Sequence, residues 1–502
     1  MSSPKTLTGI LANWAADLTL ADVPHRVIDL VVSQVLSQLG AARAGLAHPI
    51  GHKIVSAFGT PAGDDPKRNA YVLAALTMCL DFDDTVYAGH LSHSTVNTPI
   101  AYAERMGLSG AQFLEAVVCA NECAARVTAA ATLGRFRGQT ALHSHLVGAV
   151  AARSKAERLA SPLWVDGWGI ALGAPPHPLN RAFLGSDAKV LAASGAISTA
   201  LDAVDAARAG LKGAPDILEH PEGFLAALAT LPLQEAITRG LGERWHTETL
   251  SFKVYPGCAY IDAAVDCAVL LHRRIAKRLG RPPTASDIEC ITVHASVFTV
   301  GMDSHSREYV TGPNAPVAAL NFSVGYNVAA ALLHGELVPA DFHGVRVSDP
   351  DVWKTAVKVA VQLDFGLTFR SLTCTAPIGE ALREAGGPAA SEWLATMAGA
   401  AGAKIPPTLG LDFGMPAATF ENAEKSIGAR VVAVTTDGTE WEESVDTPLG
   451  AAGERTRRDH RALMRDKFLS NGGSRNAADA LENLFHLTPS ELGSSLRAAL
   501  QV

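Results

Sequence analysis

The chain has 502 residues, too many for one compact core, so about two or three folding units are expected. Hydrophobic residues make up 48% and aromatic residues 6%, which excludes a disordered protein and suits helix–helix packing better than a β-sandwich. The net charge is −8 and no basic stripe or lysine-rich tail occurs, which argues against nucleic acid as a partner. A small anionic substrate needs only a few local cations and is compatible with this charge.

Cysteine usage and hydropathy predict a cytoplasmic protein. The seven cysteines include no C-x-x-C pair, and their odd number does not suit a set of disulfides. The N-terminal residues have the pattern of a capped amphipathic helix rather than of a secretion signal. No run of about 18 or more uncharged apolar residues occurs, so no membrane contact is expected.

Helical periodicity dominates residues 7–265, where apolar residues recur at intervals of three and four. The clearest predicted helices are 25–43, 68–80, 97–107, 110–130, 141–160, 188–210 and 260–278. Glycine and proline mark the breaks between them. The run Pro175–Pro178 cannot be helical and is predicted to be a surface loop or the rim of an active site.

The pattern changes after the prolines at 282 and 283. Residues 287–300 are rich in β-branched side chains and predict a strand. Residues 429–436 and 439–445 predict a β-hairpin that turns on Asp437-Gly438.

Helical patterns return late in the chain. The predicted segments are 323–335, 350–361 and 455–500, while residues 378–427 have no clear period. The predicted fold class is therefore mainly α. A large all-α domain is expected from residues 1–268 and 451–502, with a smaller α+β lid domain of residues 269–450 inserted between them.

The densest polar cluster follows the apolar segment that ends at Leu80. Its members are Asp81, Asp83, Asp84 and Thr85, followed by His90 and His93. Carboxylates this close raise one another's pKa, and imidazole carries a proton near neutral pH, so general acid–base chemistry is one interpretation. Helix capping and loop hydrogen bonds by the aspartates explain the cluster equally well. The spacing matches no standard metal site and no HExxH motif occurs, so no metal is predicted.

A second polar cluster precedes the helix predicted at 141–160. It contains Arg135, Arg137, Gln139, His143 and His145. Two arginines at a helix entrance can bind a carboxylate through paired hydrogen bonds, with help from the helix dipole. The alternative is an ordinary solvated loop whose histidines cap the helix.

Three isolated residues are weaker candidates. Lys189 precedes an alanine-rich helix, Cys258 ends a Tyr-Pro-Gly-Cys turn, and Tyr326 lies on the helix predicted at 323–335. A surface lysine, a buried inert thiol and a packing tyrosine are the ordinary interpretations. No glycine-rich phosphate loop and no G-x-S-x-G motif occur, so neither a nucleotide cofactor nor a serine hydrolase mechanism has support.

Taken in order over nearly the whole chain, these motifs resemble the MmgE/PrpD family. The resemblance rests on Asp81–Thr85, Ser109-Gly110, Gly210–Gly213, Pro221–Phe224, Lys253–Cys258, Phe322–Tyr326, Asp437-Gly438 and Lys467-Phe468. It implies a large all-α domain with an inserted α+β lid, an active site between the two, a homodimer and no organic cofactor. It also implies a lyase or isomerase that acts on a small carboxylic acid.

The resemblance assigns roles to individual residues. Asp81 and Thr85 match the pocket aspartate and threonine of the family, and either His90 or His93 matches the histidine that follows. Lys189 matches a substrate-facing lysine, and Tyr326 matches a tyrosine of the lid.

Two positions depart from the family pattern. Gln139 stands where the family has a histidine, with His143 and His145 displaced from it, and Cys258 replaces a second histidine. These departures put the tricarboxylate dehydratase and decarboxylase activities of the family in doubt for this chain, and leave a non-catalytic binding protein as an alternative.

The resulting hypothesis is a cofactor-independent lyase that abstracts a proton beside a carboxylate or carbonyl group. Lys189, with Arg135 or Arg137, would hold the substrate, and His90 or His93 would move the proton. Asp81 would orient or tune that imidazole, Thr85 would form a hydrogen bond with the substrate, and Tyr326 would close the pocket from the lid. An isomerase or epimerase, or a decarboxylase, is the alternative within enzymes.

Overall fold

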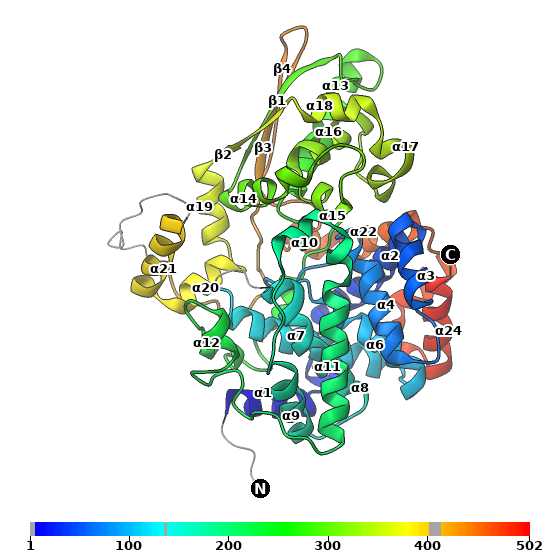
Figure 1. Cartoon of the computed structure of the whole chain (residues 1–502), viewed down its shortest axis with the longest axis vertical. Coiled ribbons are helices and arrows are strands. Elements are labelled where there is room, and N and C mark those ends of the chain that lie inside the picture. Colours follow the sequence, from blue (N-terminus) through cyan, green and yellow to red (C-terminus); the bar gives the residue numbers. More distant parts are fainter. Residues whose placement is uncertain (1–5, 135–137, 401–412, 502) are drawn as a thin grey trace.

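A computed structural model of the chain describes residues 6–134, 138–400 and 413–501. Most of these residues are helical. Within these ranges the β-structure consists of one four-stranded sheet and a few isolated bridges. Figure 1 shows the strands at one end of the long axis and most of the helices in a body below them. The mainly α fold class predicted from the sequence is confirmed.

The body is built from the helices of the first half of the chain. They are α1 (Leu7–Asp17), α2 (His25–Ala47), α3 (Pro49–Phe58), α4 (Pro66–Met78), α5 (Ser92–Thr95), α6 (Asn97–Met106), α7 (Gly110–Ala130), α8 (Ser144–Ala156), α9 (Ser161–Ala171), α10 (Asn180–Gly185), α11 (Ala192–Arg208) and α12 (Phe224–Leu228). The helix α8 packs against α7, α9 and α11 at the centre. At Gly148 of α8, a Cβ atom would lie 2.6 Å from Ser94 Oγ, so only glycine lets α8 approach α5 this closely.

Three helices at the end of the chain pack against the first helices. They are α22 (Glu454–Ser470), α23 (Arg475–Glu482) and α24 (Pro489–Leu500), and all three contact α2. The buried Arg43 guanidinium of α2 donates to the carbonyl oxygens of Asn471 at 3.1 Å and Ala499 at 2.9 Å. These bonds satisfy carbonyl groups near the ends of α22 and α24, which lack partners within their own helices.

The sheet has the strand order β2-β1-β3-β4, with β1 (Ile288–Ala295), β2 (Val359–Leu363), β3 (Ala429–Thr435) and β4 (Glu440–Val445). The pair β1–β2 is parallel and the other two pairs are antiparallel. Alternate residues of β3 are buried, as in a sheet with one face on a core. The helices α13 (Asp262–Leu279) and α16 (Val324–His334) pack against the sheet. The hairpin predicted on Asp437-Gly438 is confirmed.

Two sequence predictions about this region need correction. The strand predicted at 287–300 ends at Ala295, because α14 (Val297–Ser306) begins after Ser296. The helix predicted at 350–361 is α18 (Pro350–Ala356) followed by β2, since Val359 pairs with Ile291 across the sheet and non-local pairing overrides the local period.

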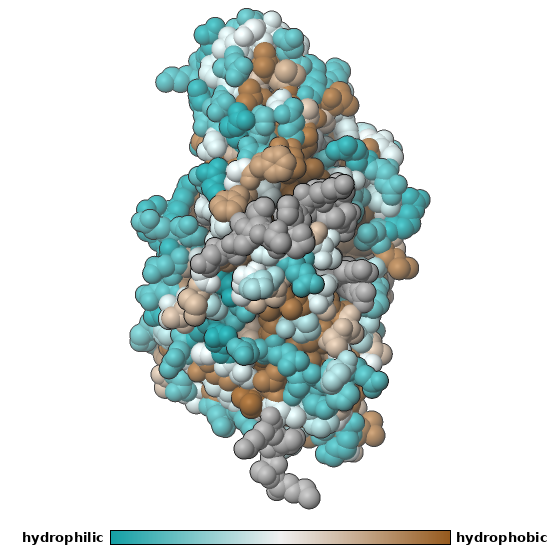
Figure 2. Space-filling model, turned by 90° about the vertical axis from the view of Figure 1, so that its left-hand side faces the viewer, coloured by the Kyte–Doolittle hydropathy of each residue, from teal (hydrophilic) through white to brown (hydrophobic). Residues whose placement is uncertain are grey.

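Five further α-helices lie between residues 317 and 400. They are α15 (Val317–Leu320), α17 (Gly344–Val347), α19 (Phe365–Thr373), α20 (Ile378–Ala385) and α21 (Gly387–Ala400). The last two lie in the segment 378–427, where the sequence has no clear period. Phe365 and Phe369 of α19 are exposed, and Figure 2, which views this side, shows hydrophobic atoms at the surface.

One helical stretch among the described residues, Asp187–Arg208, has the length and apolar composition of a membrane span. Its most apolar window is 56% buried inside the structure, where α11 packs against α4, α8 and α9. The core helix of a soluble protein meets the same criterion.

Candidate active site

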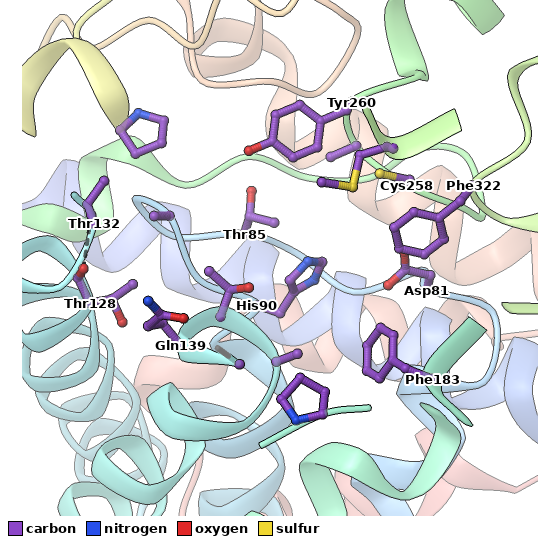
Figure 3. Close-up of a pocket in the computed structure, with 18 of the residues that line it drawn as sticks. Asp81, Thr85, His90, Thr128, Thr132, Gln139, Phe183, Cys258, Tyr260 and Phe322 are labelled. Atoms are coloured by element: carbon purple, nitrogen blue, oxygen red, sulfur yellow. Dashed lines mark hydrogen bonds between the residues drawn. The ribbon is translucent and has the colours of Figure 1, made fainter. Parts of the chain in front are cut away.

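A cavity of about 410 Å³ lies against the loop that follows α4. Its walls also come from the end of α7, the segment 178–189, the turn 258–260 and the more distant segments 302–322, 377–378 and 425–427. The ionisable and amide groups in the wall are Asp81, His90, Gln139, Lys189, Cys258, Tyr260, His305 and Lys425, with Tyr87 and Asn180. Figure 3 shows Thr85 and His90 in the middle, with Asp81 and Cys258 to one side and Gln139 to the other.

Asp81 is held between two buried lysines. Lys189 Nζ lies 3.2 Å and Lys253 Nζ 3.4 Å from Asp81 Oδ1, and Lys253 also donates to the Asp81 carbonyl oxygen at 2.7 Å. Asp81 has φ 52°, a left-handed conformation that these contacts keep in place. Burial would raise the pKa of Asp81, but the charges of Lys189 and Lys253 outweigh it and lower that pKa. Asp81 is therefore a buried carboxylate.

Two further lysines contact the same loop, residues 81–85. Lys467 of α22 donates to the Phe82 carbonyl oxygen at 2.7 Å. Lys425 Nζ lies 3.2 Å from Thr85 Oγ1. Four buried ammonium groups, from Lys189 and these distant parts of the chain, thus surround one short loop.

The imidazole of His90 is oriented by Asp83. His90 Nδ1 lies 3.0 Å from Asp83 Oδ2, and Asp83 is fully buried while the His90 side chain is 25% exposed and lines the cavity. Because Asp83 occupies Nδ1, Nε2 is the ring nitrogen left for a bound molecule. Asp83 rather than Asp81 therefore orients the imidazole, because the Asp81 carboxylate contacts Lys189 and Lys253; of the predicted role of Asp81, only the orienting part is wrong.

His93 lies behind His90 and does not line the cavity. Its Nε2 is 3.2 Å from Asp83 Oδ2, and its Nδ1 is 2.8 Å from Thr77 Oγ1. Burial lowers the pKa of His93 to about 4 despite the opposing Asp83 charge, so His93 is a neutral imidazole. Of the two histidines between which the sequence could not choose, His90 is the one in contact with the cavity.

Asp83, His90 and His93 also bring three possible metal-ligand atoms within 4.8 Å of one another. Lys253 Nζ lies 3.5 Å from Asp83 Oδ1, so an ammonium charge already adjoins this carboxylate. Burial would raise the pKa of Asp83, but the adjacent His93, His90 and Lys253 groups together hold it well below its usual value. A divalent ion would have to overcome repulsion from Lys253, which makes this set a poor match for a metal.

The second polar cluster is divided by the fold. Arg135 and Arg137 lie outside the described residues. Gln139 lines the cavity, and its Nε2 lies 3.4 Å from the Leu228 carbonyl oxygen. His143 does not line the cavity: its Nε2 contacts the Pro176 carbonyl oxygen instead. Pro178 lines the cavity, so this end of the proline run does form part of its rim.

Tyr326 does not close the cavity, and that prediction needs correction. The residue is 1% exposed on α16, where its hydroxyl donates to the Asp341 carbonyl oxygen and its ring packs on Phe342 and Trp353. Tyr87 and Tyr260 line the cavity instead, and Tyr260 is the one that follows the Tyr-Pro-Gly-Cys turn (Figure 3). The sequence offered one signal for it, its place two residues after Cys258 in the same turn.

Cys258 lines the cavity as a neutral thiol. It is 5% exposed, and burial, reinforced by the Asp81 charge, raises its pKa to about 12. The thiolate is the nucleophilic form of cysteine, so Cys258 presents a weakly polar surface rather than a nucleophile.

Iodoacetamide at about pH 8 is expected to alkylate the exposed Cys290 of the native protein and to spare Cys258, because burial keeps the Cys258 thiol protonated. Mass spectrometry of tryptic peptides over time measures both rates. The same reaction in denaturant, where both thiols are accessible, is the control. Equal rates in the native protein would show that the cavity activates Cys258.

Sequence reasoning missed two lysines. Lys253 belongs to the Lys253–Cys258 motif, but nothing local indicated its contacts with Asp81 and Asp83, 172 and 170 residues away. Lys425 lies in the segment without a clear period, and no signal marked it.

The fold and the cavity define a mainly helical protein whose buried pocket combines an imidazole–carboxylate pair with lysine ammonium groups. Residues 9–235 match the MmgE/PrpD N-terminal domain, and residues 255–372 match the MmgE/PrpD C-terminal domain. The chain belongs to the MmgE/PrpD family, and the resemblance stated from the sequence is confirmed.

Two similar proteins carry the names of enzymes. The chain is 23% identical over 389 residues to cis-aconitate decarboxylase of Aspergillus terreus (strain NIH 2624 / FGSC A1156). The aligned region covers 70% of this chain and 77% of that protein. It is 25% identical over 348 residues to the mitochondrial 2-methylcitrate dehydratase of Yarrowia lipolytica (strain CLIB 122 / E 150), covering 64% of this chain and 63% of that protein.

Proposed function

We propose that the protein is a cofactor-independent lyase that acts on a small carboxylic acid by removing a proton beside a carboxylate or carbonyl group. One observation carries the proposal: the His90 imidazole, backed by the buried Asp83 carboxylate, shares a cavity of about 410 Å³ with the Lys189 ammonium group. A cavity of this size suits a small molecule. The names of the relatives support lyase chemistry on acids.

In the proposed reaction, His90 Nε2 takes the proton from the carbon next to the carboxylate. Asp83 stabilises the imidazolium that forms, and the ammonium group of Lys189 stabilises the negative charge that develops on the substrate oxygens. Thr85 Oγ1 donates a hydrogen bond to the substrate. The electron pair left on that carbon then forms a double bond and expels the leaving group from the adjacent carbon. When the leaving group is a hydroxyl, His90 returns the proton to it and it departs as water.

Several broader features belong to the same proposal. The chain would act as a homodimer in the cytoplasm, with a helical body of residues 1–268 and 451–502 and a lid of residues 269–450. These points rest on the family membership and, for the location, on the cysteine usage.

The test is turnover of a panel of hydroxylated di- and tricarboxylates in D₂O, followed by proton NMR. We expect an unsaturated acid to form from at least one of them, with loss of water. Deuterium that enters the recovered substrate without loss of water would favour an epimerase or isomerase, and release of carbon dioxide would favour a decarboxylase. Thermal stabilisation by the acids without any turnover would replace the proposal with a binding protein.

A further inference from the structure

Lys425 is a cavity residue that comes from outside the two family domains. Those domains match residues 9–235 and 255–372, whereas Lys425 lies just before β3. Its side chain is buried, with the residue 4% exposed, and it reaches the wall of the same cavity as Lys189 and His90. The matched domains therefore assign no role to Lys425.

Lys425 differs from the other three lysines at the loop 81–85. Lys189 and Lys253 pair with Asp81 at 3.2 and 3.4 Å, and Lys467 lies 4.0 Å from Asp84. Lys425 has no carboxylate within 4.0 Å among the described residues; its Nζ bonds only to Thr85, at 3.2 Å to Oγ1 and 3.5 Å to the carbonyl oxygen.

An unpaired ammonium group in a buried wall is costly unless a negative charge joins it. The cavity offers none at this end, because Asp81 is already shared by two lysines and the Cys258 thiol is neutral. When the Lys425 amine is protonated, this end of the cavity therefore carries a positive charge that no described carboxylate within 4.0 Å balances.

We propose that Lys425, together with the Thr85 hydroxyl, binds a second carboxylate of the substrate, so that the protein selects acids with two anionic groups over acids with one. The first carboxylate would lie at Lys189. This inference rests on the proposed function for its substrate, but it concerns recognition and can be tested by binding alone.

The charge on Lys425 makes this selection dependent on pH. Burial lowers the pKa of Lys425 to about 7, and the neighbouring Cys374 opposes this shift. Lys253 and Asp262 line a small adjoining cavity together with Lys425. An anion binds the protonated amine, so above about pH 7 binding must be accompanied by proton uptake. Affinity for the second carboxylate should then fall by up to about tenfold per pH unit.

The experiment compares succinate with succinamate, which has the same shape but one carboxylate, by isothermal titration calorimetry. At about pH 6.5 we expect wild type to bind succinate at least about tenfold more tightly, and Lys425→Met to lose this preference. Lys425→Arg should keep it at both pH 6.5 and pH 9, whereas wild type should lose it by about pH 9. Lys354→Met, at a lysine exposed on α18, is the matched control and should behave as wild type.

The outcomes separate the two proposals. A wild type without preference, or a Lys425→Met variant that keeps it, overturns the second carboxylate site. The pH dependence of wild type tests the site even if a variant does not fold. A preserved preference with no turnover of any acid would leave this site standing and remove the lyase assignment alone.

Discussion

Replacing His90 with asparagine is expected to lower kcat of the proposed lyase by about 10²–10⁴-fold, the contribution of a positioned acid–base group. The imidazole lines the cavity while its Nδ1 lies 3.0 Å from Asp83, so the substitution removes the one imidazole in the described wall that has a carboxylate partner. Thermal melting should change only modestly, because the buried Asp83 carboxylate keeps His93 and Lys253 as neighbours. Steady-state turnover of the best acid from the panel measures the effect.

His305→Asn is the matched control for this substitution. His305 also lines the cavity, but it has no carboxylate partner within the described part of the chain, so we expect a loss below about tenfold. His93→Asn tests whether the buried imidazole of His93, rather than the His90 imidazole in the cavity wall, is the base. If His93→Asn abolished turnover while His90→Asn kept most of it, the assignment of the base to His90 would be wrong.

Local patterns predicted the elements that local interactions determine. The helix α7 begins where the Ser109 hydroxyl and the Gln112 side chain form a capping box, and the β3–β4 hairpin turns on Gly438, whose φ of 79° favours glycine. The cluster at 81–93 was also recognised, since its polar residues are adjacent in sequence.

Partners distant in sequence could not be predicted in the same way. Which aspartate faces the imidazole depends on Lys253, which lies 172 residues from Asp81 in sequence and contacts its carboxylate together with Lys189. Lys425 reaches Thr85 across 340 residues. The family resemblance placed Tyr326 at the pocket, but packing on Phe342 and Trp353 fixes it in the core beside the sheet. Each of these outcomes is decided by tertiary packing, which periodicity does not encode.

Arg244→Ala is expected to lower the free energy of unfolding by about 3–5 kcal/mol, as removal of one partner from a buried ion pair does. The Arg244 side chain is 3% exposed, pairs with Glu380, and lies 2.6 Å from Glu384 Oε1. Its guanidinium also stacks 4.3 Å from the centre of the Phe420 ring. Replacing Arg244 removes a positive charge from beside the buried carboxylates of Glu380 and Glu384 on α20. Urea denaturation followed by circular dichroism measures the change.

Arg370→Ala is the control, because Arg370 and its partner Asp446 are both more than half exposed and such pairs contribute about 0–1 kcal/mol. The contacts of Arg244 also affect the cavity. They hold α20, which starts at Ile378, and Ile378 lines the cavity beside Pro377. Arg244→Ala should therefore raise KM by making the position of α20 less fixed, although Arg244 itself does not line the cavity. A variant that melts like wild type but binds acids poorly would mean that Arg244 acts on the substrate directly, whereas loss of stability and affinity together would assign it the role of holding this wall in place.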